Sequence, residues 1–246
     1  MVVFDSVVIT PTTGDSKVLK AIESVKSQSR KNVKHLVVVD GGRFRGRLPA
    51  HIQDENPNLK IVQLDSNTGS EGFYGHRIYA AFSFLVNEPY VFFLDQDNWY
   101  EPDHVESMID TLEDNKYDWA HSLRYIVHDK DPSVKIPDNC ESLGKWPVWV
   151  SAYNNIKNYH VDTSTYAFKK DFLVRVGGAW YQGYGGDRNF LKIVTEQMKH
   201  ENWGTSGKYT LNYRLDGNPG SLSKDFILAG NEVTQKYYNG SFPWIK

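Results

Sequence analysis

The stretch YVFFLDQDNWYEP, residues 90–102, is the strongest indication of fold in this sequence. Its first five residues are mostly apolar and include aromatic and β-branched side chains, which is typical of a buried strand in a parallel sheet. Asp95 and Asp97 follow directly, and in an extended chain their side chains point to the same side. Two adjacent carboxylates repel each other, so they need donors or a cation nearby, and Mg²⁺ or Mn²⁺ prefers such oxygen ligands. Because open α/β sheets bind ligands beyond the carboxyl ends of their strands, the stretch predicts a metal-assisted nucleotide site.

A structural alternative stays open for the same residues. Asp-x-Asp is a short motif, and a match has meaning only in the right structural context. Asp97 or Asn98 is also a suitable cap for a following helix, so the stretch is compatible with a polar strand-to-helix loop.

Strands and helices alternate through the first half of the sequence. The predicted strands cover residues 2–10, 35–39, 59–64 and 90–94, the first of them broken by Pro11. The first predicted helix runs from a cap at Asp15-Ser16 to Asn32, and the others cover residues 72–86 and 103–112. This spacing is typical of βαβ units and a parallel sheet. Polar turns follow the four strands, and we expect them to gather at one edge of the sheet.

The second half of the sequence is less regular. Strands are predicted at residues 119–127 and 161–168, separated by a proline-rich excursion or hairpin at residues 131–149. Short helices are predicted at residues 172–176, 188–199 and 231–238, and the tail from Tyr209 has a mixed pattern. The pattern therefore predicts an α/β sheet followed by an irregular carboxyl-terminal region.

Composition and charge exclude several classes of protein. The 246 residues fit one large domain, and 40% hydrophobic with 24% charged residues is ordinary for a globular chain. A formal net charge of −2 gives no basic surface for nucleic acid. No apolar run approaches the ~20 residues of a membrane helix, and the first residues are typical of a strand rather than a signal peptide. Cys140 is the single cysteine, which excludes an intrachain disulfide and favours a reducing, cytoplasmic location.

The order of these segments resembles the inverting family-two glycosyltransferases of the GT-A fold. The resemblance covers about residues 3–195 and rests on four segments: VVITPTTGDSKVLKAIESVKSQS from residue 7, VKHLVVVDGG from residue 33, LDSNTGSEGFYGHRIYAAF from residue 64, and YVFFLDQDNWYEPDHV from residue 90. It implies a single GT-A-like domain over residues 1–246, with a Rossmann-like, mainly parallel sheet flanked by helices. Its nucleotide-sugar-binding half would be about residues 1–127, and its irregular acceptor-binding half about residues 128–246.

The resemblance implies a role for each strand end. Asp40 would accept a hydrogen bond from a base with a ring N–H, such as uracil, and Arg77 would neutralise the diphosphate. Asp95 and Asp97 would hold a divalent metal, Mn²⁺ or Mg²⁺, although Asp95 would otherwise contact the ribose. The implied nucleotide-sugar-binding residues are Pro11, Thr12, Thr13, Asp40, Asn67, Gly69, Arg77, Asp95 and Gln96.

The same resemblance implies that Asp187 is the base that takes the proton of the acceptor hydroxyl. The family places an acidic residue at the start of a late helix after a glycine-containing loop, and Gly185-Gly186-Asp187-Arg188 occupies that place. The alternative is a plain N-cap for the helix that starts at Arg188, and the two roles are compatible.

Several further residues have two interpretations each. His160 and Asp162 are either ligands for a metal or an acceptor, or a hydrogen-bonded structural pair. His200, at a helix end, either complements the helix dipole or completes a metal shell. A group of aromatic residues forms either an acceptor platform or lid, or the packing of an irregular loop: Trp180, Tyr181 and Tyr184.

Together these features predict a metal-dependent, inverting glycosyltransferase. It would move a sugar from a nucleoside-diphosphate donor, with a UDP-sugar favoured, to a hydroxyl acceptor such as a glycan. Three departures from the family pattern bear on the donor: Gly41-Gly42 after Asp40, His76 in place of an asparagine, and Gly186 beside Asp187. They leave open a non-catalytic module that binds a sugar nucleotide or glycan. A sugar nucleotidyltransferase is the third possibility, although no glycine- and basic-rich loop follows the first strand.

Overall fold

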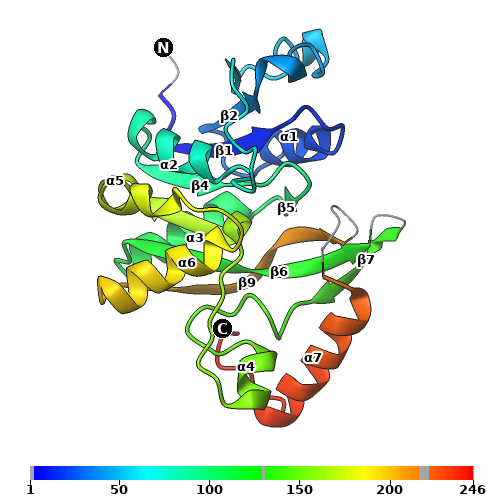
Figure 1. The fold of residues 1–246 in the computed structure, drawn as a ribbon, viewed down its shortest axis with the longest axis vertical. Coiled ribbons are helices and arrows are strands. Elements are labelled where there is room, and N and C mark those ends of the chain that lie inside the picture. Colours follow the sequence, from blue (N-terminus) through cyan, green and yellow to red (C-terminus); the bar gives the residue numbers. More distant parts are fainter. Residues whose placement is uncertain (1–2, 129–130, 216–221, 246) are drawn as a thin grey trace.

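The computed structural model describes residues 3–128, 131–215 and 222–245, which form one mixed nine-stranded sheet with helices on both faces (Figure 1). The strands lie in the order β3-β2-β1-β4-β8-β6-β9-β5, and β7 pairs with β6. The first four strands are parallel: β1 (Ser6–Thr12), β2 (Val33–Asp40), β3 (Leu59–Leu64) and β4 (Tyr90–Phe93).

The second half of the chain extends the same sheet. β8 (Tyr166–Lys169) is antiparallel to both β4 and β6 (Trp119–His128), whereas β9 (Trp203–Leu215) is parallel to β6. β7 (Asp131–Pro137) forms a hairpin with β6, and β5 (Trp99–Tyr100) pairs with β9. The α/β architecture predicted from the sequence, with a mixed central sheet, is therefore confirmed.

Helices cover the two faces of the sheet because side chains alternate along each strand. Val91 and Phe93 of β4 belong to one apolar cluster, and Phe92 and Leu94 to the other. The first cluster includes residues of α2 (His76–Leu85), α5 (Lys170–Val176) and α6 (Gly186–Lys192). The second includes residues of α1 (Val18–Lys26) and α3 (His104–Asp114). Two further helices, α4 (Trp149–Asn154) and α7 (Lys224–Tyr237), contact each other at the far end of the molecule (Figure 1).

The predicted end of the first strand at Pro11 is wrong, since β1 continues through Thr12. The carbonyl of Ile9 points toward β4, since it accepts a hydrogen bond from the backbone N–H of Leu94. Backbone groups two residues apart in a strand point to the same side, so the nitrogen of Pro11 also faces β4. β4 ends at Phe93, which pairs with Ile9. The missing N–H of proline therefore costs no strand pairing at this position.

Several predictions in the second half need correction. The expected strand 161–168 is a short helical turn (Thr163–Thr165) followed by β8. The expected helix 188–199 stops at Lys192 and continues as a π-helical turn, Ile193–Gln197. The mixed tail from Tyr209 begins inside β9, whose glycine and polar residues hide its strand character, and the helix expected at residues 231–238 starts earlier, as α7 (Lys224–Tyr237).

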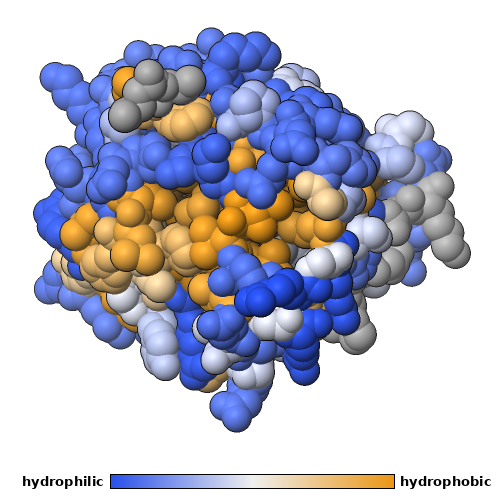
Figure 2. Space-filling model, turned by 90° about the horizontal axis from the view of Figure 1, so that it is seen from above, coloured by the Kyte–Doolittle hydropathy of each residue, from blue (hydrophilic) through white to orange (hydrophobic). Residues whose placement is uncertain are grey.

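The edge strand β3 is less buried than the strands in the centre of the sheet. Viewed from above, apolar residues gather in the middle of the surface within a hydrophilic surround (Figure 2). The sheet ends at β3, and there Ile61, Val62 and Leu64 are only partly buried, whereas the central strands are fully buried. Within the described ranges, none of the helices combines the length and apolar character needed to cross a membrane.

Candidate active site

The polar turns meet at one edge of the sheet, as the sequence predicted. The register aligns the carboxyl ends of β1, β2, β3 and β4 side by side. The hydroxyl of Thr12 donates to Oε1 of Gln96 over 2.7 Å, and the backbone N–H of Thr13 donates to the same oxygen over 3.1 Å. The Gln96 amide therefore joins the turn after β1 to the turn after β4.

Asp40 holds the turn of residues 67–69. Its Oδ1 accepts from the backbone N–H and hydroxyl of Thr68, over 2.7 and 2.8 Å, and its Oδ2 accepts from the backbone N–H of Gly69 over 2.7 Å. A Cβ at Gly69 would lie 1.7 Å from the carbonyl oxygen of Tyr74, so only glycine fits there. A carboxylate has about four acceptor positions, so the hydrogen bonds to Thr68 and Gly69 occupy most of the acceptor positions of Asp40.

Asp95 lies in an acidic environment at the end of β4. Burial raises the pKa of its carboxyl to about 7. Nearby carboxylates act in the same direction, namely those of Asp162, Asp97 and Asp187, and the hydroxyl of Tyr79, which donates to Oδ1 over 2.8 Å, offsets part of the effect. Burial also raises the pKa of Asp97. Several carboxylates thus lie close to Asp95 and make its ionisation harder.

This donor set fits a hard divalent cation. Asp95 and Asp97 supply the carboxylate oxygens that Mg²⁺ and Mn²⁺ prefer, and a cation would relieve the repulsion that raises their pKa values. In the part of the chain that the structure describes, no group of three acidic, histidine or cysteine side chains is arranged to hold a metal. Water and substrate oxygens would therefore complete the coordination shell, as is common for Mg²⁺.

A buried ion-pair network is connected to the backbone of Asp95 through Ser164. The hydroxyl of Ser164 accepts from the backbone N–H of Asp95 over 3.0 Å, and the backbone N–H of Ser164 donates to Asp162 over 2.9 Å. Asp162 accepts in turn from Arg124 over 2.6 Å, and Arg124 also donates to Asp138 over 2.7 Å. Arg124 is 1% exposed, so this network has strong, weakly screened charges.

The structure excludes both helix-cap alternatives, the one for Asp97 or Asn98 and the one for Asp187. α3 has Asp103 at its N-cap, five residues after Asn98, whose side chain instead binds Ser164 and the backbone of Arg214. α6 has Gly185 at its N-cap, in the left-handed region at φ 75°, so Asp187 lies inside the first turn. The plain N-cap interpretation of Asp187 is therefore wrong.

Asp187 forms a partly buried ion pair with the buried His160. The two groups are 2.7 Å apart between Nε2 and Oδ2, and the other ring nitrogen of His160 lies 3.5 Å from Oε2 of Glu141. Burial disfavours the charged imidazole, but Asp187 and Glu141 outweigh it and raise the pKa of His160 to about 9. Burial likewise opposes ionisation of Asp187, yet His160 and the backbone N–H of Arg188 hold its pKa well below the usual range. Asp187 is thus an ionised carboxylate at neutral pH.

His160 and Asp162 do not act as one pair, because His160 binds Asp187 whereas Asp162 binds Arg124. His200 lies 3.3 Å from Asp118, directly before the start of β6, at the sheet edge opposite Asp97. Its interpretation as a third metal ligand is therefore wrong.

Helix α2 ties the loop before Asp187 to the strand ends. Arg77 donates to the carbonyl of Thr68 over 3.2 Å, and its guanidinium stacks 3.4 Å above the ring of Phe73. Trp180 is fully buried against Tyr79 and other aromatic residues of the core, so its platform interpretation is wrong. Tyr181 and Tyr184 are exposed.

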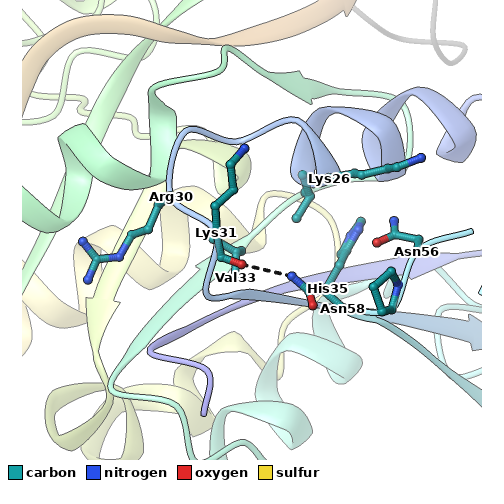
Figure 3. A pocket seen from close by; sticks show the side chains of 9 residues that line it. Lys26, Arg30, Lys31, Val33, His35, Asn56 and Asn58 are labelled. Atoms are coloured by element: carbon teal, nitrogen blue, oxygen red, sulfur yellow. Dashed lines mark hydrogen bonds between the residues drawn. The ribbon is translucent and has the colours of Figure 1, made fainter. Parts of the chain in front are cut away.

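A pocket of about 190 Å³ lies at the other edge of the sheet, between the end of α1, the start of β2 and residues 56–58 (Figure 3). Its cations already have partners: Arg30 pairs with Asp5 over 2.7 Å, and the Lys31 ammonium donates to the carbonyl of Gln28 over 2.7 Å. His35 contributes a buried imidazole, and burial lowers its pKa to about 3. Parallel sheets bind ligands at the carboxyl ends of their strands, so we place the active site at the Asp95 edge instead.

The mixed sheet and the acidic edge formed by its strand ends match a glycosyltransferase of the GT-A fold. The sequence model of the family described as Glycosyl transferase family 2 matches residues 6–172, more than half of the chain, and the chain therefore belongs to this family. The family and fold predicted from the sequence are confirmed.

Solved structures with the same fold include those of TarS from S. aureus. The structure of TarS 1–349 in complex with UDP has a TM-score of 0.62 at 14% identity, covering 95% of this chain and 65% of that one. The complex of TarS 1–349 with UDP-GlcNAc has a TM-score of 0.58 at 14% identity, covering 96% and 67%. In the TarS structure that extends beyond this fragment, the chain spans only 44% of the length, at a TM-score of 0.56 and 13% identity.

A curated relative from Haemophilus influenzae (strain ATCC 51907 / DSM 11121 / KW20 / Rd) is an uncharacterized protein. It is 28% identical to this chain in a match that covers 37% of the chain and 72% of the relative.

Sequence reasoning missed several parts of the site. Tyr79 lies within the predicted helix 72–86 and was not singled out, although its hydroxyl binds Asp95. Glu141 lies in the irregular segment after β7 and carries no motif, and Ser164 lies in a segment predicted as plain strand. Ser164 stands two residues after Asp162, and this spacing is the one feature of the sequence that could have pointed to it.

Proposed function

We propose that this protein transfers a sugar from a nucleoside-diphosphate donor, with a UDP-sugar favoured, to a hydroxyl group of a glycan acceptor, with inversion at the anomeric carbon. The observation that carries the proposal is the ionised Asp187, held by His160 in the same acidic region as Asp95 at the carboxyl ends of the strands. TarS, which has the same fold, binds UDP and UDP-GlcNAc, and this supports a UDP-sugar as donor.

The donor would lie across the four strand-end turns. Asp40 would keep the turn of residues 67–69 in place and offer its remaining acceptor position to a ring N–H of the base. Arg77, already beside that turn, would neutralise diphosphate charge. The remaining proposed contacts are Pro11, Thr12, Thr13, Asn67, Gly69, Asp95 and Gln96. In this proposal residues 1–127 bind the donor and residues 128–246 recognise most of the acceptor.

Asp187 would act as the base. As the acceptor oxygen forms its bond to the anomeric carbon, the proton of that hydroxyl passes to a carboxylate oxygen of Asp187, while the bond between the sugar and the diphosphate breaks. The backbone N–H of Arg188 and the imidazole of His160 each hold one carboxylate oxygen, so the base has a fixed orientation. Orientation of this kind removes part of the entropy cost of the reaction.

Asp95 and Asp97 would hold Mn²⁺ or Mg²⁺. When bound, the cation supplies positive charge that stabilises the leaving nucleoside diphosphate. The backbone of Asp95 is fixed by Ser164 and the side chain by Tyr79, so the protein presents these oxygens in a defined arrangement before a ligand binds.

We infer a reducing, cytoplasmic location from the single cysteine. Cys140 is fully buried, and burial raises the pKa of its thiol far above the usual range, so it is an inert core residue rather than a redox group.

The proposal is tested by calorimetric titration of a panel of UDP-, GDP-, dTDP- and CMP-sugars with and without Mn²⁺, together with an assay of nucleotide release from the same mixtures. Metal-dependent binding of one donor with slow release supports a glycosyltransferase. Binding with no release, in the presence of an acceptor mixture, would instead favour a non-catalytic module. No binding of any donor to folded protein contradicts the proposed site.

A further inference from the structure

Two loops from opposite halves of the chain meet through three aromatic contacts next to the proposed base. Phe73 lies 5.5 Å from Tyr181 between ring centroids, Tyr74 lies 6.3 Å from Tyr184, and His76 lies 6.0 Å from Trp180. The first member of each pair belongs to residues 73–76 and the second to residues 180–184. The two loops therefore form one surface, to which each half of the chain contributes.

Hydrogen bonds fix this surface in place. Nδ1 of His76 lies 3.0 Å from the carbonyl oxygen of Gln182 and 3.1 Å from that of Gly183, so its N–H can donate to the second loop. The backbone N–H of Tyr74 donates to the carbonyl of Gly69 over 2.9 Å. The loop is thereby tied to the turn that the donor is proposed to contact.

The backbone has an unfavourable conformation in the first loop and just before it. Glu71 and Tyr74 have φ of 61° and 52°, in the left-handed region that non-glycine residues rarely adopt. Such residues destabilise the fold and persist where the surrounding structure determines them, often at ligand sites. The strain points to a function for the position of the Tyr74 ring.

Two of the aromatic rings are left in solvent. Tyr74 is 58% exposed and Tyr184 is 85% exposed; Tyr181 is also exposed, but its ring packs against Phe73 and the Arg77 guanidinium. A tyrosine ring offers a rigid apolar face with a polar edge and loses little conformational entropy on binding. The residues close to the pair in the chain include the polar or glycine residues Glu71, Gly72, Gln182 and Gly183, and such neighbours suit a ligand with one apolar face and a hydroxylated rim.

We propose that Tyr74 and Tyr184 form an acceptor subsite that stacks against the ring of a carbohydrate, so that one of its hydroxyl groups reaches Asp187. The proposal rests on the proposed function. A sugar ring has an apolar C–H face and a rim of hydroxyl groups, which matches the tyrosine pair and its polar surround. Tyr184 is three residues before Asp187 in the chain, and Gly186 beside the base packs closely against the His76 ring.

The test uses the full chain saturated with UDP and presented to an immobilised array of oligosaccharides. The free oligosaccharide that gives the strongest signal is then titrated by calorimetry. We expect Tyr74→Ala and Tyr184→Ala each to weaken its binding at least tenfold, and Tyr184→Trp to retain it. Tyr153→Ala is the matched control, since Tyr153 is 73% exposed on α4, and it should bind as the wild type does.

UDP affinity distinguishes the subsite from the donor site, and it should be unchanged in all four variants. UDP binding without any oligosaccharide signal, or oligosaccharide binding that both alanine variants retain, overturns the subsite but leaves the proposed function intact. Loss of UDP affinity in the alanine variants also overturns it, because the rings would then belong to the donor site. Failure of the wild type to bind UDP overturns the proposed function and the subsite with it. Unchanged thermal unfolding curves confirm that the variants are folded.

Discussion

Replacement of His160 by glutamine should reduce stability in a way that depends on pH. His160 is buried between Asp187, at 2.7 Å, and Glu141, at 3.5 Å, and it carries a positive charge at neutral pH. Glutamine retains a side-chain N–H donor and a similar size but no charge. The substitution therefore removes the charge of the imidazolium while leaving the hydrogen bond to Asp187 possible.

The magnitude follows from the pKa of His160. A rise from the ordinary 6.5 to about 9 corresponds to a net favourable interaction of about 3 kcal/mol with the charged imidazole. Because the pKa is higher in the folded protein, this stability is fully present below pH 6.5 and is lost as the pH rises through about 9. The difference in unfolding free energy between wild type and His160→Gln should thus be about 3 kcal/mol larger at pH 6 than at pH 9.5.

Urea unfolding at the two pH values, followed by tryptophan fluorescence, measures this difference. His104→Gln is the matched control, because burial lowers the pKa of His104 to about 3 and this imidazole stays neutral throughout. The control should show the opposite trend, with a loss about 0.8 kcal/mol smaller at pH 6 than at pH 9.5, because at pH 6 His104 is protonated only in the unfolded chain. An equal loss for His160→Gln at pH 6 and pH 9.5 would refute the charged pair.

Three further predictions concern the frame of the site. Arg124→Met leaves Asp138 and Asp162 buried without a counterion, so unfolding in urea should show a loss of about 3–5 kcal/mol; a loss below about 1 kcal/mol would contradict the network. Gly69→Ala places a methyl group 1.7 Å from the carbonyl oxygen of Tyr74, so calorimetry should show at least tenfold weaker UDP binding, and normal binding would exclude this turn from the donor site. Removal of divalent metal with EDTA should weaken UDP binding at least tenfold and added Mn²⁺ should restore it; metal-independent affinity would rule out the cation site.

The position of the site was predictable because it depends on the topology of the sheet. Alternating apolar strands and amphipathic helices predict parallel strands, and parallel strands bring their carboxyl-terminal turns to one edge whatever their exact lengths. The meeting of Thr12, Asp40, Gly69 and Asp95 is thus a consequence of the hydrophobic pattern alone.

The partners of Asp187, the proposed base, were not predictable in the same way. His160 and Asp187 lie 27 positions apart in irregular segments, where no periodicity relates one residue to the other. Glu141 is brought to His160 by the irregular chain that follows β7. The burial of Trp180 had no signal either, since it depends on how α2 packs against the helical turn Gly177–Trp180.

The central claim, that Asp187 is the base of a sugar transfer at this edge of the sheet, is tested most directly by Asp187→Asn. Binding of UDP-GlcNAc and release of UDP would be measured on the same samples of wild type and variant in the presence of Mn²⁺. We predict that the variant binds the donor within about threefold of the wild type and releases UDP at least a hundredfold more slowly, since general base catalysis commonly contributes a factor of this size. Release at the wild-type rate by a folded Asp187→Asn protein would contradict the assignment.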